Sequence, residues 1–99
     1  MKERRNYNLG IILNKRHFNL LVIDSHYEKK HPDINDKLIL ELVEQLNGIN
    51  IEIAAESDGF KYLAYGMCFN GKAYRMVLTY CEEDFLGVIN VFRVKEKKQ

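Results

Sequence analysis

The stretch FKYLAYGMCF-NG-KAYRMVLTYC, residues 60–81, largely decides the expected fold of this chain. Two runs rich in aromatic and β-branched residues flank Asn70-Gly71, a dipeptide that readily adopts the positive φ angles of a tight hairpin turn. A two-residue turn at this dipeptide sets Phe69 opposite Lys72 and Cys68 opposite Ala73. The sequence therefore predicts two long antiparallel strands.

The same register sorts the side chains of this hairpin onto two faces, because successive residues of a strand alternate. One face is bulky, and we expect it to pack under a helix; it carries Leu63, Tyr65, Met67, Tyr74, Met76, Leu78 and Tyr80. The other is a surface of small residues with an arginine in its middle; it carries Tyr62, Ala64, Gly66, Cys68, Ala73, Arg75, Val77 and Thr79.

Further strands are expected on both sides of the hairpin. Period-two patterns at residues 49–56 and 85–94 predict its neighbours, joined through Ser57-Asp58-Gly59 and Glu82-Glu83-Asp84. Short links force antiparallel neighbours, so residues 49–94 predict a meander of four strands. Upstream, the apolar runs 7–13 and 18–23 predict a β-hairpin. In an alternative, the first run is an arm that joins the sheet only at its edge.

Helical signals lie between these two groups of strands. Ser25 followed by Glu28 has the spacing of a capping box, which predicts one or two helical turns that end before Pro32. A second helix is expected to begin at Asp33 or Asn35, and its apolar residues recur at helical spacing until Asn47-Gly48.

Together these elements predict one α+β domain over residues 1–99. It has an N-terminal hairpin, one or two helices, and a four-stranded antiparallel meander with the helix packed on one face. Residues 1–6 and 95–99 are expected to be flexible tails.

Composition limits the classes of function. The chain has 99 residues, of which 46% are hydrophobic, and its net charge of +1 does not by itself indicate nucleic-acid binding. We expect a cytoplasmic protein without membrane contact, because no apolar run approaches the roughly 18 residues that span a bilayer and no secretion signal is visible. Cys68 and Cys81 lie too far apart in the predicted hairpin for a disulfide. We expect both to be reduced, and neither a metal nor another cofactor.

Histidines and lysines gather in the segment SHYEKKH, residues 25–31. His26 directly follows the N-cap position, where backbone N–H groups favour anions, and histidine titrates near neutrality. His26 is therefore a candidate for moving protons at a phosphate, with Lys30 and His31 as candidates for contacting a substrate. The alternative is a solvated turn. His26 and His31 do not share a helical face, and no third ligand stands at a metal-site spacing.

Two arginines are candidates for holding a phosphate. Arg75 rises from the small-residue face, where its guanidinium could bind an anion with both arms. The alternative is an ion pair with Glu52 or Glu56. Arg93, near the end of the last predicted strand, is a similar candidate, although the pattern does not show which face of that strand is covered. Tyr62 could stack on a base.

The order of these segments resembles small bacterial proteins related to RelE-type toxins, which have the barnase–colicin–RelE ribonuclease-like fold. The resemblance covers residues 25–94 and is one of pattern. It is carried by SHY at residues 25–27, the helix predicted at 33–47, DGFKY at 58–62, GKAYRMV at 71–77 and GVINVFR at 87–93.

The resemblance implies metal-independent cleavage of RNA, in which a ribose 2′-hydroxyl attacks the adjacent phosphate. His26 would be the acid or base, Arg75 and Arg93 would hold the scissile phosphate, and Thr79 would be a supporting hydrogen-bond donor. The chain departs from such toxins in its near-neutral charge and in the hairpin at residues 7–24. The alternative is a non-catalytic interaction module, similar to an antitoxin, immunity protein or inhibitor, which docks a protein on the exposed sheet face or an edge strand.

Overall fold

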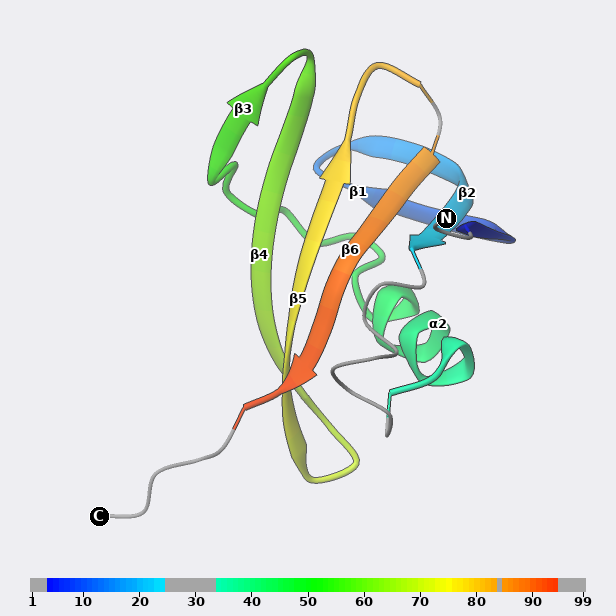
Figure 1. The fold of residues 1–99 in the computed structure, drawn as a ribbon, viewed down its shortest axis with the longest axis vertical. Coiled ribbons are helices and arrows are strands. Elements are labelled where there is room, and N and C mark those ends of the chain that lie inside the picture. The colour runs from blue at the N-terminus through cyan, green and yellow to red at the C-terminus, as the bar shows by residue number, and fades with distance from the viewer. Residues whose placement is uncertain (1–3, 25–33, 84, 95–99) are drawn as a thin grey trace.

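The computed structural model describes residues 4–24, 34–83 and 85–94, and most of these residues belong to one sheet of six strands (Figure 1). The strand order across the sheet is β1-β2-β6-β5-β4-β3. In chain order the elements are β1 (Arg4–Leu13), β2 (Arg16–Asp24), α2 (Asp36–Glu44), β3 (Ala55–Ser57), β4 (Phe60–Phe69), β5 (Lys72–Tyr80) and β6 (Phe85–Arg93).

The predicted fold class is wrong. We expected an α+β domain whose four-stranded antiparallel meander is covered by a helix, with the N-terminal hairpin as an addition. Instead β2 pairs in parallel with β6, Leu20 beside Phe85 and Ile23 beside Val88, so all six strands form one mixed sheet. The sheet curls, and β1 and β2 run across the direction of β4 and β5 in Figure 1. A parallel partner far along the chain has no turn between the strands, and so it leaves no local signal in the sequence.

The strand predicted at residues 49–56 is also wrong over most of its length, because only Ala55–Ser57 pairs with β4. Ile49 instead makes a single parallel bridge with Leu13 at the end of β1. The side chain of Asn14 binds the backbone of Ile51 twice, accepting from its N–H at 2.5 Å and donating to its C=O at 2.9 Å. These contacts satisfy the backbone without a strand partner.

Helix α2 begins where one of the two predicted starts placed it. Asn35 is the N-cap, and its side-chain oxygen accepts the backbone N–H of Leu38 at 2.9 Å. The helix ends at Glu44, earlier than predicted, because the residues that follow bind β1. Asn47 accepts the Ile12 N–H at 2.8 Å, and Gly48 donates to the Ile12 C=O at 2.6 Å. The helical turns predicted after Ser25 lie outside the described residues.

The predicted register of the central hairpin is confirmed, with Phe69 opposite Lys72 and Cys68 opposite Ala73. Its bulky face is the inner face of the curled sheet and forms the core together with α2. Fully or almost fully buried members of that core include Leu63, Met76 and Leu78 from the hairpin and Ile39, Leu42 and Val43 from the helix.

Among the described residues, no helix is both long and apolar enough to cross a membrane. Both cysteines are free, in agreement with the prediction that Cys68 and Cys81 are not joined.

Candidate functional site

The outer face is the side of the sheet turned away from the core, and it is the candidate binding surface. Its members follow from the register, since opposed residues share a face and successive residues alternate. They are Leu20, Val22, Phe60, Tyr62, Ala64, Gly66, Cys68, Ala73, Arg75, Val77, Thr79, Phe85, Gly87, Asn90 and Phe92. The rings of Phe60, Tyr62, Phe85 and Phe92 are all half-buried. A sheet face with several partly exposed aromatic rings is suited to binding.

Arg75 is the exposed cation of the outer face. It lies on β5 with Gly66 opposite it on β4 and Phe92 opposite it on β6. Gly66 has no side chain to cover the guanidinium. Within the described residues the Arg75 side chain has no hydrogen bond or ion pair, so the alternative pairing with Glu52 or Glu56 is not formed. Its five donors are therefore available to an anion.

Tyr62 and Thr79 lie opposite each other on the outer face, one on β4 and one on β5. The Thr79 hydroxyl donates to the Lys61 backbone C=O at 3.0 Å, so its proton is already in use and its oxygen is left to accept. Thr79 lies four residues from Arg75, about 13 Å along the strand. Tyr62 and Thr79 would therefore meet a different part of an extended ligand from the part that Arg75 holds.

Arg93 lies on the opposite side of the sheet from Arg75. A bulge in the β5–β6 ladder lies between the pair Val77–Asn90 and the pair Leu78–Val88. Beyond it, Arg93 is opposite Tyr74, whose side chain is buried in the core. The Arg93 side chain therefore projects from the inner side of the sheet, although it is exposed at the strand end. The structure does not bring the two arginines together around one phosphate.

A hollow of about 150 Å³ opens on the outer face beside Tyr62 and Thr79. Apart from the Thr79 hydroxyl, the side chains that line it are apolar; the lining residues are Val22, Phe60, Thr79, Phe85, Gly87, Val88 and Ile89. Gly87 forms part of its floor, and a Cβ there would lie 3.0 Å from the Thr79 Cγ2. A larger residue at this position would therefore need Thr79 to move.

His26, Lys30 and His31 lie outside the described residues, so their place relative to Arg75 is not part of the described geometry. Among residues 4–24, 34–83 and 85–94, no group of three or more histidine, cysteine or acidic side chains is placed to hold a metal ion.

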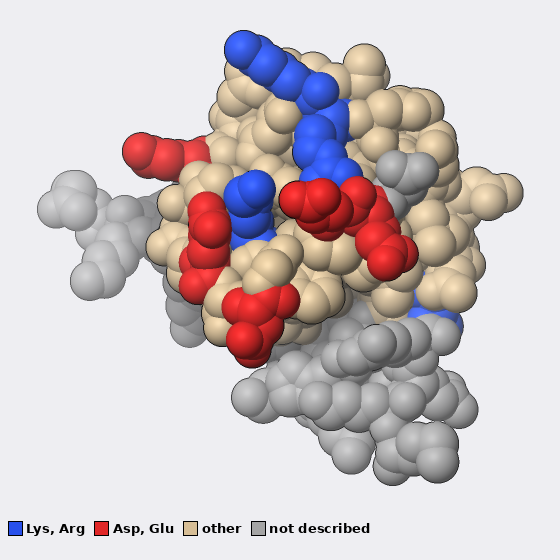
Figure 2. All heavy atoms as spheres, turned by 90° about the horizontal axis from the view of Figure 1, so that it is seen from above, with Lys and Arg blue, Asp and Glu red and all other residues tan. Residues whose placement is uncertain are grey.

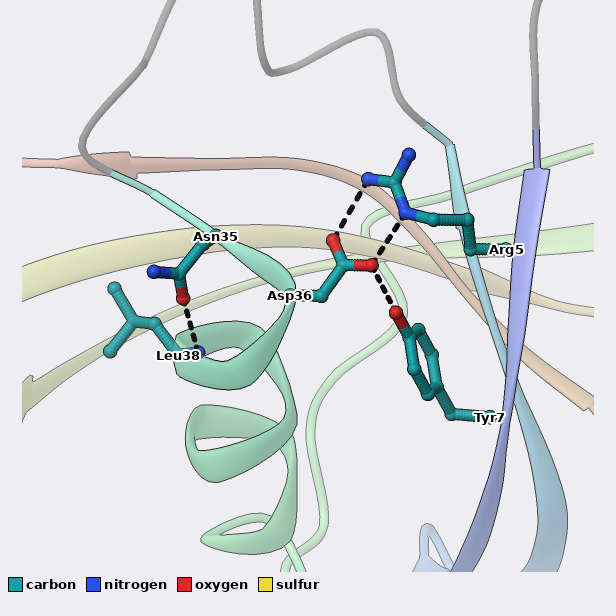
Figure 3. Close-up of polar contacts among 5 residues, drawn as sticks. All are labelled: Arg5, Tyr7, Asn35, Asp36 and Leu38. Atoms are coloured by element: carbon teal, nitrogen blue, oxygen red, sulfur yellow. Dashed lines mark hydrogen bonds and ion pairs between the residues drawn. The ribbon is translucent and has the colours of Figure 1, made fainter.

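A cluster of polar side chains at the β1 edge of the sheet was not predicted from the sequence. Asp36, in the first turn of α2, lies between Arg5 and Tyr7 of β1 (Figure 3). Arg5 donates to both carboxylate oxygens, at 2.5 and 2.8 Å, and the Tyr7 hydroxyl donates to one of them. This hydrogen bond, with smaller contributions from burial and from the charge of Asp36, raises the pKa of Tyr7. Asp36 directly after the Asn35 cap was the available signal, but nothing pointed to β1 as its partner.

Charge is mixed at the end of the molecule that carries the β3–β4 and β5–β6 turns. Lys and Arg side chains lie next to Asp and Glu side chains there (Figure 2). A depression at this end is lined by Arg16, Gly59, Lys61, Cys81 and Glu82. Because both signs of charge lie side by side, the described residues at this end do not form the single basic patch that would attract a nucleic acid backbone.

Comparison with models of protein families, with curated proteins and with solved structures finds no match to this chain.

Proposed function

We propose that this protein is a metal-independent endoribonuclease of the RelE-like type that binds single-stranded RNA across the outer face. The observation that carries the proposal is the position of Arg75. Its exposed guanidinium stands without an ion-pair partner among the described residues, on a face that also bears four half-buried aromatic rings.

Both kinds of side chain suit unpaired RNA. Aromatic rings on an open sheet can stack on splayed bases, and an arginine can bind a phosphate with two parallel hydrogen bonds. Because the net charge is only +1, few phosphates can be neutralised. We therefore expect RNA affinity to depend on stacking and to fall only gently with added salt.

In the proposed reaction a ribose 2′-hydroxyl attacks the neighbouring phosphorus atom. Arg75 stabilises the charge that develops on the phosphate oxygens. His26 takes the hydroxyl proton or supplies one to the leaving oxygen, a role that rests on the resemblance to RelE-type toxins. Arg93 has no role in this reaction, because its side chain projects from the inner side of the sheet.

The test compares two exposed arginines on opposite faces. Labelled single-stranded RNA is incubated in the presence of a chelator with wild type, Arg75→Ala, Arg93→Ala and His26→Ala. We expect Arg75→Ala to slow cleavage by about 100-fold, as loss of one transition-state donor does in other enzymes. His26→Ala should remove cleavage but keep RNA binding, and Arg93→Ala should stay within about twofold of wild type. Absence of cleavage by wild type, or equal effects of the two arginine changes, would refute the proposal.

A second candidate function is favoured by the hollow on the outer face. Its lining side chains are mostly apolar, which suits a surface that receives a protein side chain. In this case the protein is a non-catalytic interaction module, and wild type neither binds nor cleaves RNA. Gly87→Val, which fills the hollow, should then weaken the binding of a co-purifying protein partner, whereas Arg93→Ala should leave that binding unchanged.

A further inference from the structure

Within the described part of the chain, the edge of β4 has no strand partner over most of its length. The short strand β3 pairs only with its beginning, Ser57 with Phe60 and Ala55 with Tyr62. From Leu63 to Phe69 no described residue pairs with this edge. Figure 1 shows the same arrangement, with β3 beside one end of β4 and the far end of the β4–β5 hairpin projecting beyond it.

The open edge presents a regular set of backbone groups. The Tyr62 carbonyl accepts the N–H of Ala54, so the backbone of Tyr62 is directed away from β5. Because this direction alternates along a strand, the N–H and C=O of Ala64, Gly66 and Cys68 point the same way. These groups have the spacing that another strand would need for pairing.

This edge also lacks the features that keep exposed strands apart. Residues 63–69 include no charged residue and no proline, and no bulge interrupts their ladder with β5. The opposite edge of the sheet is different. The β1–β2 ladder shifts register between Asn8 and Ile11, and Ile12 is bonded to residues 47 and 48. The β4 edge is therefore the one suited to strand addition.

We propose that two copies of this chain pair antiparallel through residues 63–69 of β4, about a two-fold axis at Gly66. The segment LAYGMCF is similar when read in either direction from Gly66. In this register Tyr65 faces Met67, Ala64 faces Cys68 and Leu63 faces Phe69 of the second copy. Apolar residues meet apolar residues at each position, and no like charges oppose.

A second copy fits better than a charged peptide, because this edge has no charge with which to select one. Tyr65, Met67 and Phe69 are half-buried on the inner face, and pairing would remove more of their surface from water. The inference is independent of the proposed cleavage of RNA. It also places the two outer faces side by side in one sheet, with the two Arg75 residues three strand spacings apart, about 14 Å.

The first experiment tests the register with charges. Sedimentation measures the mass of wild type, Ala64→Lys/Cys68→Lys and Ala64→Lys/Cys68→Glu over a dilution series. We expect wild type to be a dimer. The double lysine variant sets lysine against lysine and should raise the dissociation constant by about tenfold or more, whereas the lysine–glutamate variant should restore pairing. Asn6→Lys/Asn8→Lys adds the same charge to β1 and should remain a dimer.

The second experiment traps the pair chemically. Opposed residues of a hydrogen-bonded antiparallel pair lie about 5.5 Å apart between Cα atoms, within disulfide range. Ala64→Cys should therefore form a disulfide with Cys68 of the second copy on mild oxidation, whereas wild type should not. A wild type that stays monomeric at every concentration with its circular dichroism spectrum intact overturns the inference. So does a dimer that the double lysine variant leaves unchanged.

Discussion

Arg5 and Asp36 form a two-armed ion pair that fastens the edge strand β1 to the first turn of α2. The Arg5 Nε lies 2.5 Å from one carboxylate oxygen and its Nη2 lies 2.8 Å from the other. The two side chains are 27% and 18% exposed, so water screens the pair only in part. Asp36 also lies where the helix dipole favours a negative charge.

Asp36→Asn should lower the free energy of unfolding by about 1–2 kcal/mol, because hydrogen bonds to a charged group are stronger than neutral ones. Chemical denaturation measures the effect. Glu44→Gln is the matched control, since it removes a carboxylate from the exposed last turn of the same helix. Equal losses in the two variants would show that the pair with Arg5 contributes nothing specific.

Tyr7 predicts a change of stability in alkaline solution. Its hydroxyl donates to Asp36, and this hydrogen bond raises the pKa of Tyr7 above its ordinary value of 10.0. The fold therefore favours the neutral phenol. Its contribution is fully present below pH 10.0 and is lost as the pH rises through the raised pKa.

Thermal unfolding of wild type and Tyr7→Phe between neutral and strongly alkaline pH tests this. The difference in melting temperature should be constant near neutrality and shrink at high pH, because Tyr7→Phe has no proton to lose. Because both proteins share the other tyrosines and the lysines, the titration of those groups cancels in the difference between the two melting temperatures. A difference that grows with pH would mean that the hydrogen bond is not the cause.

Asn14 should be a sensitive position outside the core. Its side chain binds both backbone groups of Ile51, and its amide also donates to the Tyr80 hydroxyl at 3.2 Å. Its φ of 53° is left-handed, which asparagine tolerates better than alanine. Asn14→Ala should therefore lower the free energy of unfolding by about 2–4 kcal/mol.

Asn14→Gly separates the two causes, because glycine adopts this φ freely but lacks the amide. We expect it to be less destabilising than Asn14→Ala by about 1 kcal/mol in urea denaturation. If the two variants were equal, the backbone conformation would not matter at this position. If both were close to wild type, the contacts with Ile51 would carry no stability.

The parts of the fold that the sequence predicted are those whose signal is local. Asn70-Gly71 sets the register of β4 and β5, and the alternation of large and small residues then separates the core from the outer face. The same reasoning placed Arg75 correctly on the small-residue side. A full strand at residues 49–54 was expected, but alternating apolar residues also suit a segment along the core that has only an isolated strand bridge, at Ile49, and is bound at Ile51 by the Asn14 side chain.

The remaining differences come from contacts between distant residues. No turn connects β2 directly with β6, so their pairing has no local signal in the sequence. This pairing makes the N-terminal hairpin part of the one sheet. The bulge near Val77 moves Arg93 away from the side of Arg75, and a single sequence gives no sign of it. Arg5 lies within residues 1–6, which were expected to be a flexible tail, and its partner Asp36 is 31 residues further along the chain, so the contact leaves no local signal in the sequence.

Arg16 connects the start of β2 with the turn that precedes β6, and it yields a final prediction. Its guanidinium carbon lies 5.2 Å from the ring centres of both Phe18 and Tyr80. It also donates to the Cys81 carbonyl and, at 3.0 Å, to the Glu83 carbonyl. One planar cation thus contacts both the start of β2 and the turn between β5 and β6.

Arg16→Lys keeps the charge but loses the planar fork that reaches two carbonyls while stacking on rings. We expect it to lower the free energy of unfolding by about 1–2 kcal/mol, and Arg16→Ala by slightly more. Lys15→Ala removes an exposed cation from the turn between β1 and β2, next to Arg16 in the sequence, and should have little effect beyond its local backbone. Hydrogen exchange should also quicken in β6 next to β2 for Arg16→Lys. If the β6 amides of Arg16→Lys exchanged as slowly as those of wild type, Arg16 would not support the parallel pairing of β2 with β6.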